Sequence, residues 1–224
     1  MKFGPDFRRC LDRSAVHIWR FRLVRETGDV ASSRRASGLA VRSVLSKYLG
    51  CPPSDVEIAY TASGKPQLQR VPATGVVPLH FNLSRSGGLG VVAVTSIGPL
   101  GVDLERVRPI GDVSRMAERF FAPSEAAAIL AERESDKLSA FYRCWTRKEA
   151  YAKAVGKGLA IPFDRFAVSV GTASPPAIVW LDGEDPSHWS LHTFSPWAGH
   201  VGACAIQTPL PDPAFVVRDV ILTP

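Results

Sequence analysis

Two carboxylates stand two residues apart in the segment GVDLE, at Asp103 and Glu105. Side chains of a strand alternate between its two faces, so both carboxylates would leave the same face, about 6–7 Å apart along the chain. Oxygen ligands at this separation can share one hard cation, and Mg²⁺ is the cation that such ligands suit. A D-x-E pair is also compatible with a solvated strand edge, and the pair alone leaves both interpretations open.

Three further side chains recur every four residues, at Trp145, Glu149 and Lys153. Residues at these spacings share one face of a helix. Glu149 and Lys153 therefore either act on a ligand or form a helical ion pair worth about 0.2–0.5 kcal/mol. Trp145 is flanked by aromatic residues and is of a type that commonly packs in a core. The nearby Lys148 is charged but needs no functional role.

Two loops offer donors for an anion. In SGKPQL, the proline stiffens the turn and Gly64 allows close approach, so Lys65 can be presented to a phosphate. In NLSRS, the hydroxyl and guanidinium donors of Ser84, Arg85 and Ser86 precede two glycines and can form a phosphate cradle. Each segment is also compatible with an ordinary surface turn.

The elements that must position these residues follow from the hydrophobic periodicity of the chain. The strongest predicted helix spans 136–159, carries Glu149 and Lys153, and is closed by Gly156 and Gly158. Other helices are predicted at 29–50, 113–121 and 122–132, the last with Ser124 as its N-cap. Strands are predicted at 15–23, 56–60, 79–84, 89–98, 100–105, 166–170, 177–181, 189–194, 201–207 and 215–222.

The arrangement of these elements predicts an α+β fold in which helices and antiparallel strands are segregated in each half of the chain. The strands at 89–98 and 100–105 are expected to pair across the turn at Gly98 and Pro99. No low-complexity linker separates the halves, so we expect them to pack as one unit. The division is placed at 1–106 and 107–224, with the active site at the interface.

The charge of the chain is unevenly distributed. The net charge is +6, and residues 1–50 hold 11 Lys and Arg against 4 Asp and Glu, which leaves 16 against 17 for the remainder. A cationic N-terminal segment attracts phosphates or an acidic partner. No helix-turn-helix, zinc-finger or aromatic RNA-binding signature accompanies it, so nucleic acid is not expected as a partner.

Membrane insertion and export are not expected either. No run approaches the about 20 uninterrupted apolar residues of a membrane helix, and the first residues lack the apolar region of a signal peptide. The four cysteines share no metal-ligand or disulfide spacing. We therefore expect a cytoplasmic protein with reduced thiols and no membrane partner.

The order and spacing of four motifs are more specific than any one of them. GKP, NLSxS, GVDLE and WTRKEAYAKAVGKGL follow one another, with RFFAPSEAAAIL between the last two. This pattern resembles the 4′-phosphopantetheinyl transferases, in particular the larger surfactin-synthetase-activating type. The resemblance covers about 38–158 and extends more loosely to the C-terminal strands.

The resemblance implies an activity and a fold. Members move the phosphopantetheine arm of coenzyme A onto a serine of an acyl, polyketide or peptidyl carrier protein and release 3′,5′-ADP, with Mg²⁺ bound. Larger members fold two similar α/β halves into one chain with a pseudo-twofold relation, antiparallel sheets each packed with helices. A monomer is the expected state, and fatty acid biosynthesis or secondary metabolism is the expected setting.

The resemblance also implies roles for individual residues. Mg²⁺ would be bound by Asp103, Glu105 and Glu149. Glu149 or Glu105 would be the base for the carrier serine, directly or through water. Lys153 would neutralise charge that develops on the pyrophosphate oxygens. The nucleotide half of coenzyme A would contact Lys65, Ser84 and Arg85, and its 3′-phosphate would contact Arg34 or Arg35.

This chain departs from the family pattern at two places. Arg85 stands where members usually have histidine, and an arginine keeps the anion contact but does not lose its proton near neutral pH. We predict that Arg85→Ala raises KM for coenzyme A and that Arg85 contributes no titration to the pH profile; an unchanged KM would contradict this. The second departure is the short, polar segment 24–33, where members usually carry an extra helical stretch and a basic segment.

Two rival functions remain compatible with the residues. A catalytically impaired relative that binds coenzyme A or a carrier protein is motivated by Arg85 and the short N-terminal segment, but the intact acids and Lys153 argue against it. A Mg²⁺-dependent phosphoesterase would need the acids but not the GKP and NLSxS motifs. Whether an apo carrier protein gains the mass of the phosphopantetheine arm distinguishes the transferase from both rival functions.

Overall fold

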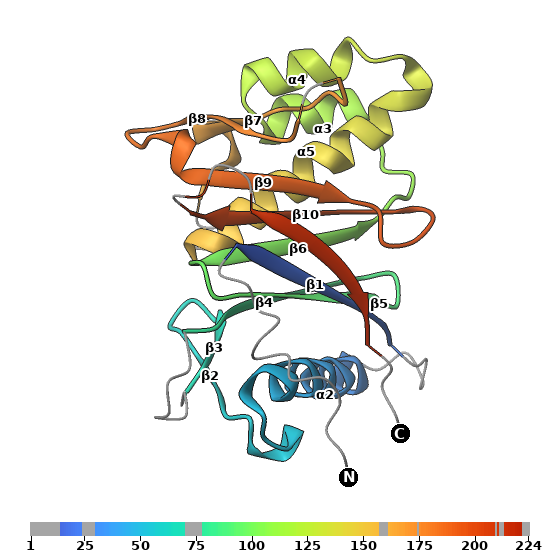
Figure 1. Ribbon diagram of the computed structural model, residues 1–224. Coiled ribbons are helices and arrows are strands. Elements are labelled where there is room, and N and C mark those ends of the chain that lie inside the picture. Colours follow the sequence, from blue (N-terminus) through green and yellow to red (C-terminus); the bar gives the residue numbers. More distant parts are fainter. Residues whose placement is uncertain are drawn as a thin grey trace.

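The computed structural model describes residues 14–23, 30–69, 78–156, 161–173, 175–208, 210 and 213–220. Its main elements form four layers in the order helix, sheet, sheet, helix (Figure 1). The α+β prediction is confirmed at this level, since helices cover sheets of largely antiparallel strands.

The first sheet has the strand order β11, β1, β5, β4. Its strands are β11 (Ala214–Asp219), β1 (Ala15–Arg22), β5 (Leu89–Thr95) and β4 (His80–Ser86), and α2 (Val30–Leu49) covers its outer face. β5 pairs antiparallel with β1 and with β4. The expectation of antiparallel strands fails for one pair, because the C-terminal strand β11 returns to the N-terminal sheet and lies parallel to β1.

The second sheet has the order β6, β10, β9 and carries the long helix on its outer face. Its elements are β6 (Leu100–Arg106), β10 (His200–Gln207), β9 (Trp189–Phe194) and α5 (Glu134–Val155). α5 ends at a left-handed Gly156, as predicted, whereas Gly158 lies outside the described residues. β6 pairs antiparallel with β10, so a strand from the first half of the sequence joins two from the second.

The predicted pairing of the strands around Gly98 and Pro99 is therefore wrong. The chain crosses at this turn from the first sheet to the second, and the N–H of Gln207 on β10 donates to the carbonyl of Pro99. β5 is buried along all seven residues because α2 covers one of its faces and the second sheet covers the other. An apolar face can be satisfied by either neighbour, so alternation alone does not choose the pairing partner.

The core between the two sheets follows from strand alternation. Val16 and Ile18 of β1 face the second sheet, where they meet Val102 and Leu104 of β6. The alternate residues of β1, His17, Trp19 and Phe21, face α2. β6 thus buries one set of side chains between the sheets and presents the alternate set toward α5.

The remaining elements lie beside these layers. They are the β2–β3 hairpin (Ile58–Tyr60 and Pro66–Leu68), α3 (Val113–Phe120), α4 (Pro123–Leu130), β7 (Phe166–Val168) and β8 (Ile178–Leu181). None of the helices described here combines the length and apolar character needed to cross a membrane.

Ser124 is not the N-cap of α4. The helix begins at Pro123, two residues earlier than a Ser124 cap implies, and the capping position is Ala122. Its N–H donates instead to the carboxylate of Glu125, at 2.9 Å. Proline is suited to the first position of a helix because its missing N–H would have no partner there.

Lys148 has a structural role in the fold. Its side chain is fully buried and its ammonium lies 2.7 Å from the carboxylate of Glu125. The same ammonium donates to the carbonyls of Phe163 and Phe166. The carboxylate of Glu125 accepts from the N–H of Val168, so both partners of the buried pair have further hydrogen bonds. The pair connects α4, α5 and the start of β7.

A buried polar cluster joins β1 to α2 and makes stability sensitive to acid. The indole of Trp19 donates to the hydroxyl of Tyr48 at 2.6 Å, and that hydroxyl is hydrogen-bonded to Nδ1 of His17 at 2.7 Å. Burial, with the charge of Arg218 as a second cause, lowers the pKa of His17 to about 4, so His17 is neutral in the folded protein near neutral pH.

We predict that the protein loses stability as the pH falls from about 6.5 to about 4. Over this range His17 becomes protonated in the unfolded chain but stays neutral in the folded protein. This difference lowers the free energy of unfolding by up to roughly 3 kcal/mol. Urea unfolding at a series of pH values measures the loss. In His17→Phe the acid-dependent part should shrink, because the titrating group is gone; an unchanged pH profile in this variant would contradict the assignment.

Candidate active site

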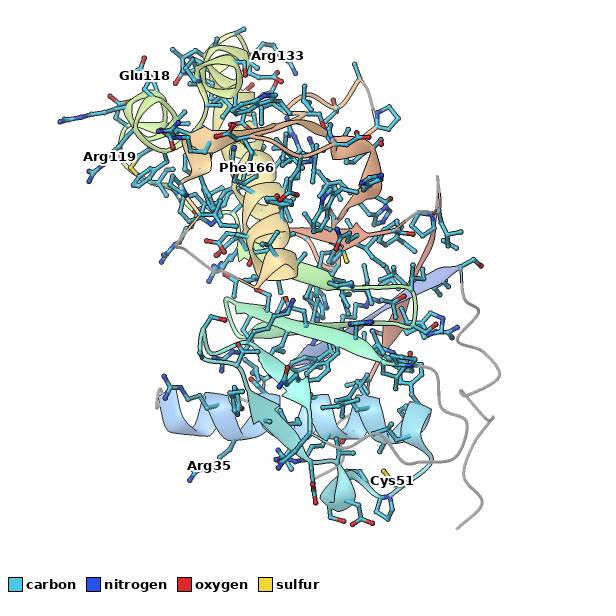
Figure 2. All side chains as sticks on the ribbon, turned by 90° about the vertical axis from the view of Figure 1, so that its left-hand side faces the viewer. Arg35, Cys51, Glu118, Arg119, Arg133 and Phe166 are labelled. Carbon is cyan, nitrogen blue, oxygen red and sulfur yellow. The ribbon has the colours of Figure 1, made fainter. Side chains whose placement is uncertain are left out.

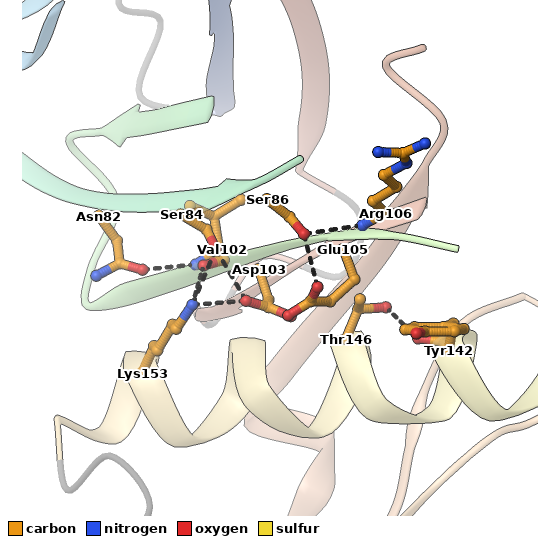
Figure 3. A network of polar contacts seen from close by, with 10 residues as sticks. All are labelled: Asn82, Ser84, Ser86, Val102, Asp103, Glu105, Arg106, Tyr142, Thr146 and Lys153. Atoms are coloured by element: carbon orange, nitrogen blue, oxygen red, sulfur yellow. Dashed lines mark hydrogen bonds and ion pairs between the residues drawn. The ribbon is translucent and has the colours of Figure 1, made fainter. Parts of the chain in front are cut away.

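Asp103 and Glu105 lie on the face of β6 that points toward α5, as the alternation of the strand predicts (Figure 3). The alternating residues Val102 and Leu104 are fully buried in the core between the sheets. Asp103 is itself only 3% exposed, whereas Glu105 is half-buried. The structure therefore excludes the alternative interpretation of this pair as a solvated strand edge.

Side chains of β4 connect that strand to β6 without a backbone ladder. The amide oxygen of Asn82 accepts from the N–H of Val102 at 2.9 Å, and the hydroxyl of Ser84 donates to Oδ1 of Asp103 at 2.9 Å (Figure 3). Alternate residues of β4 thus hold β6 and orient one of its carboxylates. These two contacts account for the polar residues Asn82 and Ser84 of the NLSRS motif without a ligand.

Ser86 holds the second carboxylate in the same way. Its hydroxyl donates to Oε2 of Glu105 at 2.7 Å and accepts from the N–H of Arg106 at 3.0 Å. Burial raises the pKa of Glu105, and the hydrogen bond from Ser86 opposes that effect. Ser86, expected as a donor of a phosphate cradle, thus donates to Glu105 instead. Asn82 is a functional candidate that the motifs did not indicate; its two-residue spacing from Ser84, which the acids share, was the available signal.

Lys153 joins the long helix to these residues. Its ammonium lies 2.6 Å from Oδ1 of Asp103 and donates to the hydroxyl of Ser84 at 3.1 Å and to the carbonyl of Val102 at 3.3 Å. The cation therefore contacts β6 and β4 at once. The alternative of a simple helical ion pair between Glu149 and Lys153 is not the arrangement seen, because Lys153 pairs with Asp103.

Glu149 lies one turn before Lys153 and faces the same set of charges. Burial raises its pKa to about 7, with the negative charge of Asp103 as the second cause and that of Glu105 as a smaller one, while Lys153 lowers it. Three carboxylates from β6 and α5 thus lie close enough to repel one another. Such mutual repulsion is relieved by protonation or by a cation.

Gly101 allows β6 and α5 to approach this closely. A Cβ atom at this position would lie 2.1 Å from the carbonyl oxygen of Ala150 and 2.3 Å from the nitrogen of Ala154, both backbone atoms of α5. No other residue type fits without moving the helix. The glycine of GVDLE therefore sets the distance between the acids of the strand and those of the helix.

The fit of these residues to a divalent cation rests on Asp103. Its Oδ2 is buried and has no hydrogen-bond partner, and leaving a buried charged acceptor unpaired costs at least about 1–3 kcal/mol. In the part of the chain that the structure describes, no three His, Cys, Asp or Glu side chains form a ready-made metal site. Lys153, at Oδ1, leaves Oδ2 as the atom that a hard cation would satisfy.

The other residues expected to contact coenzyme A fall in different places. Arg85 follows Ser84 on β4 and so leaves the opposite face, where its guanidinium donates to the hydroxyl of Ser37 on α2 at 3.2 Å. Arg34 precedes Ser37 by three residues and shares its helix face. Figure 2 shows Arg35 on the side of α2 that faces away from the sheets.

Lys65 points inward rather than toward an anion. Its ammonium donates to three backbone carbonyls, those of Leu100, Lys153 and Ala154, at 3.1, 2.6 and 3.0 Å. All three of its donors are taken, so it has none to offer a phosphate in this arrangement. The side chain of Lys65 points toward these carbonyls because folding brings them close to it, and the GKP motif alone does not show this.

A cavity of about 220 Å³ opens beside Lys153. It is lined by Ser63, Gly64, Lys65, Pro66, Asn82, Leu83, Lys153 and Gly156. The GKP turn thus helps to line the cavity even though the ammonium of Lys65 is engaged elsewhere.

Trp145 belongs to the core, as its aromatic neighbours suggest. Its ring stacks on Phe141 and meets Phe120, Phe121 and Phe163 edge-on or tilted, with centroids 5.5–6.3 Å apart. It anchors the face of α5 that also carries Glu149 and Lys153, and packing accounts for its presence in the motif.

Comparisons with known proteins identify the family of this chain. Residues 99–205, which include β6 and α5, match the model of the 4′-phosphopantetheinyl transferase superfamily. The chain is 31% identical over 215 residues to 4′-phosphopantetheinyl transferase HetI of Nostoc sp., covering 85% of this chain and 87% of HetI. It is 30% identical over 177 residues to 4′-phosphopantetheinyl transferase Sfp of Bacillus subtilis, covering 79% of this chain and 75% of Sfp.

Among solved structures, the holo-(acyl-carrier-protein) synthase of Thermotoga maritima matches 50% of this chain and 64% of its own, at 22% identity and a TM-score of 0.38. The sequence relatives carry the assignment. The chain belongs to the 4′-phosphopantetheinyl transferase superfamily, and its enzyme class is that of a phosphopantetheinyl transferase.

Proposed function

We propose that this protein transfers the 4′-phosphopantetheine arm of coenzyme A to a serine of a carrier protein and releases 3′,5′-ADP in a Mg²⁺-dependent reaction. The proposal rests on one observation: charged side chains of β6 and α5 lie close together beside a cavity that Lys153 lines. They are Asp103, Glu105, Glu149 and Lys153. Phosphoryl-type transfer depends mainly on positioning and charge neutralisation, and these residues supply both.

Asp103, Glu105 and Glu149 are the residues that would hold Mg²⁺. The ion would supply neutralisation of the pyrophosphate charge. Ser84 and Ser86 orient the two carboxylates of β6 through the hydrogen bonds described above. Lys153 is placed to neutralise the negative charge that develops on the pyrophosphate oxygens as the bond to 3′,5′-ADP breaks.

The carrier serine needs a base. Its hydroxyl oxygen attacks the phosphorus that bears the pantetheine arm, the phosphorus–oxygen bond to 3′,5′-ADP breaks, and the serine proton passes to the protein. Glu149 or Glu105 would accept this proton, directly or through a water molecule. Burial raises the pKa of both groups, so each is a stronger proton acceptor than an exposed carboxylate.

The nucleotide contacts are proposed for a smaller set of residues than the motifs suggest. Arg85 and Arg34 lie toward the same side of α2 and would bind phosphate, while the proposal for Arg35 is weakened by its direction (Figure 2). Ser84 and Lys65 are engaged within the protein. The 220 Å³ cavity, which Gly64 and Pro66 help to line, would receive part of the nucleotide.

The setting and the organisation of the chain complete the proposal. The acceptor would be an acyl, polyketide or peptidyl carrier protein, and the enzyme would act as a cytoplasmic monomer. The halves 1–106 and 107–224 would be related by an approximate twofold axis, which is supported by the way one long helix covers each of the two sheets. The site would lie where these halves meet.

The test is a mass measurement. The protein is incubated with coenzyme A, Mg²⁺ and one of several apo carrier proteins, and each carrier is weighed by intact-mass spectrometry. A gain of one phosphopantetheine group, absent when Mg²⁺ is chelated by EDTA, is the expected result. No gain in mass on any carrier would contradict the proposal and favour a protein that binds coenzyme A or a carrier without transfer. Release of phosphate without transfer would indicate a phosphoesterase.

A further inference from the structure

The hairpin turn between β2 and β3 has a fixed shape. The N–H of Thr61 donates to the carbonyl of Lys65 at 2.9 Å, and the N–H of Gly64 donates to the carbonyl of Thr61 at 2.9 Å. The N–H of Lys65 donates to the hydroxyl of Thr61 at 3.0 Å, and Gly64 takes a positive φ of 81°. The turn is therefore braced before it contacts any other element.

This turn caps the C-terminal end of α5. The last four carbonyls of a helix lack partners within the helix. Lys65 donates to two carbonyls of this end, those of Lys153 and Ala154, and the hydroxyl of Ser63 donates to the carbonyl of Gly156 at 2.7 Å. The capping groups come from about 90 residues earlier in the chain, so the cap is tertiary.

The charge of Lys65 suits the position. The C-terminal end of a helix carries a partial negative charge, which a cation stabilises. Burial lowers the pKa of Lys65 to about 8, and the three carbonyl acceptors favour its charged form. Its third contact is the carbonyl of Leu100, the first residue of β6. One ammonium thus connects the end of the helix that bears Lys153 to the start of the strand that bears Asp103.

We propose that Lys65 and Ser63 form a tertiary helix cap that positions Lys153 for the reaction. Lys65 holds the backbone of Lys153, while Asp103 and Ser84 hold its ammonium. Loss of the cap would let the last turn of α5 fray and would move the cation away from Asp103. Lys65 is then a positioning residue and not a phosphate contact; the kinetic consequence rests on the proposed transferase function, whereas the structural one does not.

The test compares Lys65→Met with Lys137→Met. Methionine keeps the unbranched apolar stem and removes the three donors, and Lys137 lies at the other end of the same helix in an exposed ion pair with Glu134. Hydrogen exchange monitored by mass spectrometry should show amides of residues 153–156 exchanging at least about tenfold faster in Lys65→Met, with no change in Lys137→Met. Turnover should fall about tenfold to a hundredfold while KM for coenzyme A changes less than about threefold.

Unchanged exchange at 153–156 together with a raised KM would overturn the proposal and return Lys65 to the role of a nucleotide contact. If Lys65→Met does not fold, Ser63→Ala decides, since Ser63 is exposed and the substitution removes only the bond to Gly156 and the contact with the hydroxyl of Thr61 within the turn. Faster exchange of residues 153–156 supports the cap, and unchanged exchange overturns it. If the wild-type protein transfers no arm, the proposed function fails, but the exchange result still decides the cap.

Discussion

Glu149→Gln should abolish transfer while leaving the protein at least as stable as the wild type. Glutamine has the same shape but neither binds a divalent cation as a charged ligand nor accepts the serine proton, so kcat/KM should fall by about a thousandfold. Stability should not fall, because burial, with the charge of Asp103 as a second cause, disfavours the charged form of Glu149 and raises its pKa to about 7, and a neutral glutamine removes that unfavourable charge. Intact-mass kinetics and thermal unfolding measure the two effects.

Glu134→Gln is the matched control. Glu134 lies in the first turn of the same helix, and its carboxylate is 89% exposed in an ion pair with Lys137. This variant should keep full turnover and lose less than about 1 kcal/mol of stability. Retained turnover in Glu149→Gln would show that Glu149 is neither a metal ligand nor the base.

Gly101→Ala should cost both fold stability and activity. The added Cβ would meet backbone atoms of α5 at 2.1 and 2.3 Å, at Ala150 and Ala154, and backbone atoms cannot rotate away as a side chain can. Overpacking of this kind costs about 1–3 kcal/mol or more. Because α5 carries Glu149 and Lys153, the displacement that relieves the clash also separates them from Asp103, and turnover should drop with stability in urea unfolding and transfer assays.

Gly111→Ala provides the comparison, since a Cβ there would meet nothing within 4 Å and the residue has no positive φ. We expect stability and turnover of this variant to match the wild type. Wild-type stability in Gly101→Ala would mean that α5 does not lie against β6 as closely as described.

Local periodicity predicted the faces and the elements well, but not their partners. The two-residue alternation placed Asp103 and Glu105 together on one face, and the 3.6-residue period placed Glu149 and Lys153 on one side of α5. The same alternation could not show that β6 leaves β5 for the second sheet, because an apolar strand face packs equally well against either layer. The charge-free stretch of β5, which is apolar up to Thr95, was the available signal, since a strand buried on both faces must lie between two layers.

The directions of long polar side chains were the least predictable part of the site. Lys65 and Ser84 were expected to bind a nucleotide because their residue types suit an anion, yet both donate to groups of the protein. Their acceptors, carbonyls at the end of α5 and the carboxylate of Asp103, become neighbours only through tertiary packing. A motif therefore predicted which residues gather at the site but not which of them face the substrate.

Asp103 and Glu105 of β6 and Glu149 of α5 are proposed to share one divalent cation, and anomalous diffraction from Mn²⁺-soaked crystals locates such an ion directly. We predict one manganese peak at about 2–2.3 Å from Oδ2 of Asp103 and from a carboxylate oxygen of each glutamate. The peak should be absent from crystals of Glu149→Gln. A peak at another place, or none in crystals of protein that transfers the arm in solution, would contradict the proposed metal site.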